Sequence, residues 1–134
     1  KDREPRAAIE AVLQLANGKR IKFVATHLDH LADETDRLMQ TRFLADRYSN
    51  ETMPFIIAGD LNALPTDASL KSLFTIASQP AKDKNDYTWP SGLPEKKIDY
   101  FLLSKNSPWK CTKFEVIEEK QISDHRPVLM ELKW

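Results

Sequence analysis

The segment 55–58 is wholly apolar and ends abruptly at Gly59, after which Asp60 and Asn62 follow within three residues. A buried strand that ends on a carboxylate and an amide must supply partners for both, because an unpaired buried polar group costs about 2–7 kcal/mol. Three other apolar segments also adjoin polar side chains: His27, Asp99 and the pair Asp124-His125. Polar groups delivered by four separate strand-like segments predict one shared site.

The composition predicts a single domain with a hydrophobic core. The chain has 134 residues, of which 41% are hydrophobic, and this length is typical of one domain. Lys+Arg and Asp+Glu number 20 each, so the net charge gives no argument for a nucleic acid or an anionic membrane as partner. The single Cys111 excludes an intrachain disulfide. No apolar run approaches the roughly 20 residues of a membrane-spanning helix, and the compartment stays undetermined.

Hydrophobic periodicity predicts six strands and two helices. The strands are expected at 6–15, 20–26, 53–58, 98–103, 110–118 and 128–133, with a tight turn at Asn17-Gly18 between the first two. The helices are expected at 31–48, with Arg37 outward, and from Thr66 or Asp67 to about residue 76. The polar segment 79–96 predicts a long loop, and Lys82, Lys84 and Lys96-Lys97 predict a solvated face.

This element order predicts an α+β fold, in which a mixed sheet carries helices on one face. The sequence leaves open whether the strands at 20–26 and 53–58 run parallel or antiparallel.

Asp60 and Asn62 are two residues apart, so in an extended chain their side chains project from the same side. They lie where a strand gives way to a loop, which is the usual place for ligand groups in open α/β sheets. Carboxylate and amide oxygens suit Mg²⁺, which also retains waters and binds phosphate oxygens.

His27 and His125 can donate to anionic oxygens or transfer protons near neutral pH. Asp99 or Asp124 behind a histidine would fix its tautomer and stabilise its cationic form. With the carboxylate of Asp60 and the amide of Asn62, these groups predict metal-assisted attack of water on a phosphate ester.

Each motif taken alone also has a structural interpretation. The segment 60–62 could be a turn, because Gly, Asp and Asn favour turns. His27 could be a hydrogen-bonded histidine at a strand end, Asp99 could form a structural ion pair, and Asp124-His125 could be a loop. Asp29-His30 is interpreted as a polar cluster where the helix begins, outside the site. If only these structural roles apply, the chain is a plain α/β binding module and the polar groups do not converge.

Four motifs together resemble the endonuclease/exonuclease/phosphatase family of DNase-I-like phosphoesterases. They are Thr26-His27-Leu28, Gly59-Asp60-Leu61-Asn62, Lys97-Ile98-Asp99-Tyr100 and Ser123-Asp124-His125. The resemblance covers nearly the whole chain and implies about half of a four-layer sandwich, with two sheets face to face and helices outside. Residues 1–134 would be its C-terminal part, and the N-terminal part, which in the family supplies an Asn and the principal metal-ligand Glu, is absent from this sequence.

The resemblance also implies roles for individual residues. Asp60 would orient and help deprotonate the attacking water, and Asn62 would position the water and the phosphate. His125 would contact the scissile phosphate with Asp99 as its orienting carboxylate, and His27 would be a second phosphate-binding histidine. The implied metal ligands are Asp124, Asp60 and Asn62, with Mg²⁺ as the cofactor and Mn²⁺ as an alternative.

The function implied is a metal-dependent phosphoesterase that hydrolyses a phosphodiester or phosphomonoester by activated water, although this fragment alone could be inactive. A nucleic-acid substrate is possible but is not favoured by the charge. The alternative is a non-catalytic half-domain that acts as an interaction or assembly module. Half a sandwich would expose one apolar sheet face, which predicts either a missing N-terminal half or self-association.

Overall fold

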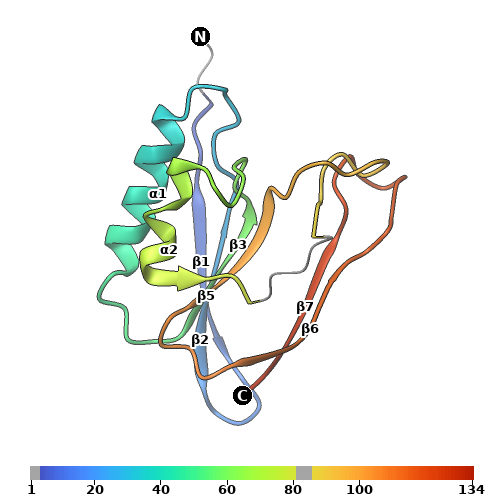
Figure 1. Ribbon diagram of the computed structural model, residues 1–134. Helices are drawn as coiled ribbons and strands as arrows, with labels where there is room; N and C mark the ends of the chain where they lie inside the picture. The colour runs from blue at the N-terminus through green and yellow to red at the C-terminus, as the bar shows by residue number, and fades with distance from the viewer. Residues whose placement is uncertain (1–3, 81–85) are drawn as a thin grey trace.

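Five strands form the central sheet of the computed structural model, which describes residues 4–80 and 86–134 (Figure 1). In order across the sheet they are β1 (Ala8–Gln14), β2 (Arg20–Thr26), β3 (Phe55–Asp60), β5 (Asp99–Ser104) and β4 (Ala77–Ser78). β2 and β3 are parallel, and all other neighbours are antiparallel. The question that the sequence left open is therefore decided, and the mixed sheet is confirmed.

One face of this sheet is covered by three helical segments (Figure 1). They are α1 (Thr35–Tyr48), the 3₁₀ turn η1 (Ala68–Leu70) and α2 (Leu73–Ile76). Val24, Ile57 and Leu102 of the sheet pack with Leu44 and Leu70 of the helical layer, and none is more than 4% exposed. Burying each such side chain contributes about 1.5–3 kcal/mol, so this layer anchors the strands that end at the candidate site.

The last two strands form a second sheet rather than joining the first. β6 (Lys110–Val116) and β7 (Val128–Lys133) pair antiparallel and lie over the face of the main sheet away from the helices (Figure 1). Met130 and Leu132 of β7 pack with Ile56 and Leu103 of the main sheet. Helices, a central sheet and part of a facing sheet agree with the predicted half of a four-layer sandwich.

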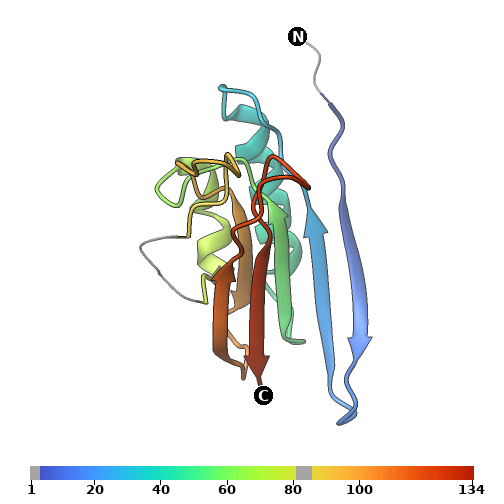
Figure 2. The same cartoon turned by 90° about the vertical axis from the view of Figure 1, so that its right-hand side faces the viewer.

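The second sheet leaves β1 uncovered (Figure 2), whereas Ile21 and Phe23 of the adjoining β2 belong to the core cluster that includes Met130 and Leu132. Every residue of β1 is exposed, including Ile9 at 72% and Leu13 at 42%. Ile9, Ala11 and Leu13 alternate along β1 and lie on one face of it, so the exposed patch on this strand is apolar. The predicted uncovered sheet face is therefore reduced to β1, because apolar residues of β2, β3 and β5 on the same side pack with the second sheet.

Two helix predictions differ from the structure. α1 begins at Thr35 rather than residue 31, because Asp33 Oδ1 accepts hydrogen bonds from the Thr35 backbone N at 3.1 Å and Oγ1 at 2.6 Å. The single helix expected up to residue 76 is divided into η1 and α2. Asp67 does not cap it through its side chain, because Asp67 Oδ2 accepts from Leu64 N at 2.8 Å instead.

Two cations predicted to be solvated are buried. Arg37 is only 5% exposed, and its Nη1 donates to the carbonyls of Asp29 at 3.0 Å and Leu31 at 2.6 Å. Lys97 is 4% exposed and forms an ion pair with Asp86.

Some predictions fall on residues that the structure does not describe. Lys82 and Lys84 lie outside the described residues, as does the centre of the loop expected at 79–96. In the described part of the chain, no helix has the length and apolar character needed to cross a membrane.

Candidate active site

The ends of β2, β3 and β5 meet at Gly59. A Cβ atom on this residue would lie 1.8 Å from the carbonyl oxygen of Thr26, and its φ of +143° is one that other residues rarely adopt. The close approach allows Leu28 N to donate to the carbonyl of Asp60 at 3.0 Å. A glycine is therefore required for the segment after β2 to lie beside the end of β3.

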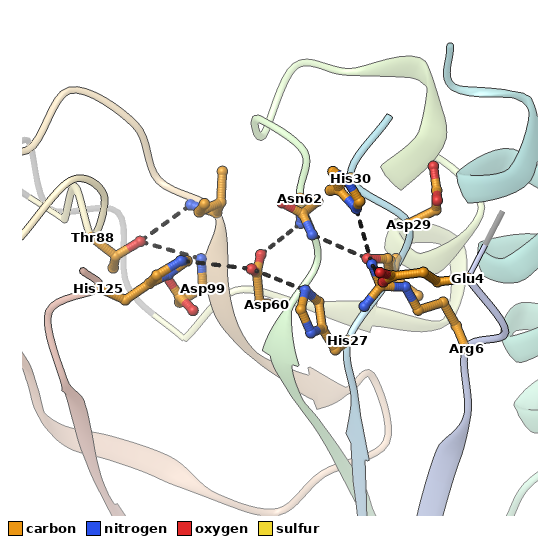
Figure 3. Close-up of polar contacts among 12 residues, drawn as sticks. Glu4, Arg6, His27, Asp29, His30, Asp60, Asn62, Thr88, Asp99 and His125 are labelled. Carbon is orange, nitrogen blue, oxygen red and sulfur yellow. Dashed lines mark hydrogen bonds and ion pairs between the residues drawn. The ribbon is translucent and has the colours of Figure 1, made fainter. Parts of the chain in front are cut away.

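Asp60, the last residue of β3, is the centre of the polar cluster (Figure 3). Its Oδ1 accepts from Asn62 N at 2.8 Å. Its Oδ2 lies 3.4 Å from Nε2 of His27 and 3.8 Å from Nε2 of His125. Burial raises the pKa of Asp60, the charge of Asp99 adds to the rise, and the Asn62 hydrogen bond and both histidines offset part of it. Asp60 is thus a more basic carboxylate than an exposed aspartate.

Asn62 is held in the left-handed region with a φ of 47°, which Asn tolerates better than most residues. Its Nδ2 donates to the carbonyl of Leu28 at 3.0 Å. The hydrogen bond from Asn62 N to the Asp60 side chain is an Asx turn. The structural turn considered for segment 60–62 is therefore real, and it coexists with the placement of both side chains at the cluster.

His125 is oriented by Asp99, the first residue of β5. Nδ1 of His125 lies 2.8 Å from Oδ2 of Asp99. Burial of the ring lowers the pKa of His125, but the hydrogen bond and charge of Asp99, with the charges of Asp60 and Asp124, outweigh it and raise the pKa overall. With Nδ1 engaged by Asp99, Nε2 of the ring is the nitrogen next to Asp60.

The predicted site residues converge on one open cleft of about 700 Å³. The candidates that line it are His27, Asp60, Asn62, Asp124 and His125, whereas Asp99 lies behind His125. His27 is 56% exposed in its side chain, and Asp124 is exposed as well. The interpretation of the chain as a plain binding module required these polar residues to lie apart from one another. The structure instead brings them together around one cleft.

Sequence reasoning missed several residues that line the same cleft. They are Glu4, Arg6, His30, Trp89 and Lys96. Asp29 is 2% exposed and accepts from Leu31 N at 2.9 Å, as suits a structural cluster before the helix, but its neighbour His30 faces the cleft. The spacing of His27 and His30 was a usable signal for His30. Nothing in the sequence marks Arg6, because only the sheet brings the start of β1 to this place.

The cluster has donors that fit a divalent cation. One oxygen each of Asp60 and Asp99 and one ring nitrogen of His125 lie within 4.8 Å of one another. Among the described residues this group does not include the predicted ligand Asp124, which lines the same cleft, and Asp99 of the group is also bonded to His125. Hard oxygen donors of this kind match Mg²⁺ or Mn²⁺.

Comparison with models of known protein families identifies the family of this chain. The model of the Endonuclease/Exonuclease/phosphatase family matches residues 4–125. The chain belongs to this family. The resemblance carried by the four short motifs is confirmed, and among the curated proteins none matches the chain.

Solved structures share the endonuclease/exonuclease/phosphatase fold. A mannosyl-6-phosphatase of Bacteroides thetaiotaomicron VPI-5482 superposes with a TM-score of 0.83 at 18% identity, covering 97% of this chain and 58% of that one. A family protein of Bacteroides vulgatus gives 0.79 at 22%, covering 96% and 55%. D. rerio TDP2 complexed with single strand DNA product gives 0.79 at 18%, covering 96% and 62%. The chain thus spans a little over half the length of these structures.

Proposed function

We propose that this chain is part of a metal-dependent phosphoesterase that hydrolyses a phosphodiester or phosphomonoester by attack of an activated water. The observation that supports it most is the convergence of Asp60, the His125–Asp99 pair, His27 and Asn62 at one cleft. Membership of a family of phosphoesterases supports the same reaction.

Asp60 is proposed to hold and deprotonate the attacking water. Its raised pKa brings its basicity closer to that needed for proton transfer near neutral pH. Asn62 fixes one oxygen of Asp60 through its backbone N, which leaves Oδ2 toward the two histidines. No covalent intermediate on the protein is needed.

His125 and His27 are proposed to bind the phosphate. The raised pKa of His125 favours the imidazolium, which can donate from Nε2 to a phosphate oxygen while Asp99 holds Nδ1. His27 is more exposed and can donate to a second oxygen or to the leaving group. Such donors stabilise the charge that develops on the phosphate in the transition state.

A divalent cation held by Asp60, Asn62 and Asp124 would neutralise phosphate charge when bound. We propose Mg²⁺, with Mn²⁺ as a substitute. In the family the principal Glu ligand comes from the N-terminal part, so activity is expected only in a protein that includes that part.

The test is hydrolysis of p-nitrophenyl phosphate and of bis(p-nitrophenyl) phosphate by the full-length protein. Turnover of at least one is expected with Mg²⁺, with loss on adding EDTA and recovery with excess Mg²⁺ or Mn²⁺. His125→Ala should abolish it, and Lys110→Ala, an exposed change on β6, should not. Turnover that survives both EDTA and His125→Ala would refute the proposal.

The uncovered apolar residues of β1 favour a second candidate function, assembly with another copy of this chain. Ile9 and Leu13 are large and exposed side chains on this face, and such patches mark association sites. Sedimentation velocity of the 134-residue chain tests it: a dimer is expected that Ile9→Glu converts to monomer. A chain that is monomeric at high concentration contradicts this candidate, as does a dimer that Ile9→Glu leaves intact.

A further inference from the structure

His30 and Arg6 form a pair at the cleft that the catalytic arrangement does not use. Both line the cleft that contains Asp60 and His125. They lie on the His27 side of Asp60, away from His125 (Figure 3). A phosphate placed over Asp60 between the histidines would therefore have this pair beside it.

The contact between the two side chains fixes the tautomer of His30. Nη2 of Arg6 lies 3.0 Å from Nδ1 of His30. A guanidinium can only donate hydrogen bonds, so Nδ1 must accept. A ring that accepts at Nδ1 carries its proton on Nε2, and His30 is exposed. His30 is thus preset as a donor at Nε2.

Arg6 also places a positive charge at this end of the cleft. Its side chain is only 12% exposed, and its Nε is buried without a hydrogen-bond partner among the described residues. Its ionic partner Glu4, at 3.0 Å, is 63% exposed. Because Glu4 is largely solvated, its ion pair neutralises the charge of Arg6 only weakly. A ligand anion can therefore also interact with the Arg6 guanidinium.

We propose that His30, oriented by Arg6, is a substrate-binding residue that recognises a second anionic group beside the scissile phosphate. This inference rests on the proposed phosphoesterase function and narrows its substrates to phosphate esters that carry another phosphate or carboxylate. His30 contacts the second anion, and Arg6 is a positioning residue that also supplies charge.

Binding of phosphonates to the full-length protein tests this subsite without turnover, because their carbon–phosphorus bonds resist hydrolysis. The probes are the terminal bisphosphonates of ethane, propane and butane, each compared by calorimetry with the monophosphonate of the same chain length. At least one bisphosphonate is expected to bind about tenfold more tightly than its partner, the effect of one hydrogen bond to a charged group.

Variants separate recognition from structural support. His30→Leu and Arg6→Gln should each reduce the ratio of the two affinities toward unity. His30→Gln should keep it, because glutamine can place an amide donor near the position of Nε2. Arg42→Gln removes an arginine from the exposed surface of α1 and should leave the ratio unchanged.

Two results would overturn the subsite: equal affinities in the unmodified protein, or a preference that persists in both His30→Leu and Arg6→Gln. Turnover of p-nitrophenyl phosphate or of bis(p-nitrophenyl) phosphate by the same preparations reports the proposed function separately. A protein that hydrolyses either ester but shows no preference between the phosphonates keeps the phosphoesterase function and loses the subsite. A protein that shows the preference without turnover keeps the subsite as an anion-binding site and loses the phosphoesterase function.

Discussion

Asp60 and Asp99 face each other directly across the β3–β5 pair, at the end of the ladder where the cleft begins. Two carboxylates in such positions repel each other, and the ring of His125 lies next to both. The sheet register therefore creates an electrostatic cost that a protonated histidine, and a bound cation, would relieve. Sites of this kind give up stability for function.

Asp60→Asn is expected to lower the rate of phosphate-ester hydrolysis by about 10²-fold or more, because it removes the proposed base. It should leave the free energy of unfolding at neutral pH unchanged or higher. The pKa of Asp60 is raised in the folded state, so its ionised form destabilises the fold at a pH above that pKa, and an amide does not carry this cost. Initial rates and urea denaturation of the same preparation measure both. An unchanged rate contradicts the role given to Asp60.

Asp99→Asn is expected to move the alkaline limb of the activity profile to lower pH. Asp99 raises the pKa of His125 through a hydrogen bond and its charge, so its loss lets burial lower that pKa. If catalysis needs the imidazolium, activity is lost as pH rises through the pKa of His125, and the loss then begins earlier. NMR titration of the His125 ring gives an independent measure. A ring pKa that stays the same or rises in the variant would refute this account, and Glu115→Gln on β6 is the distant control.

Gly59→Ala should destabilise the fold by about 3 kcal/mol or more, because the new methyl group collides with a backbone carbonyl at a strained φ. Gly92→Ala is the matched control, since a Cβ there meets nothing within 4 Å. The difference between the two midpoints of urea unfolding measures the effect. Equal midpoints would show that the end of β3 can move away from β2 without cost.

The free energy of unfolding should fall in acid, because an ion-pair network links Lys22 of β2 to Glu10 of β1 and to Glu51 after α1. Lys22 Nζ lies 2.6 Å from Glu51 and 3.3 Å from Glu10. The hydrogen bond from Lys22 lowers the pKa of Glu51, and that from Tyr48 lowers the pKa of Glu10. A lowered pKa contributes stability above the ordinary carboxyl value of about 4.3, and this contribution is lost as the pH falls through the folded-state pKa.

The check is the free energy of unfolding measured from neutral pH down to about pH 3, which spans the ordinary carboxyl pKa. Lys22→Met should flatten the acid part of this curve, because Glu51 and Glu10 both lose the Lys22 ammonium and Glu10 keeps only Arg47, at 4.0 Å. A variant whose stability falls as steeply as that of the unmodified chain would show that the network does not cause the acid sensitivity.

The strands and the catalytic candidates follow from local patterns, because each depends on residues close together in the chain. Alternation identified β1, the turn at Asn17-Gly18 identified β2 as its partner, the apolar run at 55–58 identified β3, and the polar breaks identified Asp60 and His125. Arg37 could not be placed this way. From the sequence alone, a charged residue on a helix is expected to be exposed. Arg37 is buried because the fold brings the carbonyls of Asp29 and Leu31 within hydrogen-bonding distance of its guanidinium.

The sequence by itself determined which chemical groups are present and that they end strand-like segments, since hydrophobic periodicity and turn chemistry are local properties. Only the tertiary structure decided that β2 and β3 are parallel, that β6 and β7 form a second sheet, and that Arg6 and His30 meet beside Asp60. These outcomes depend on contacts between residues far apart in the chain. The free energies of such contacts cannot be inferred from the residues of any one short segment.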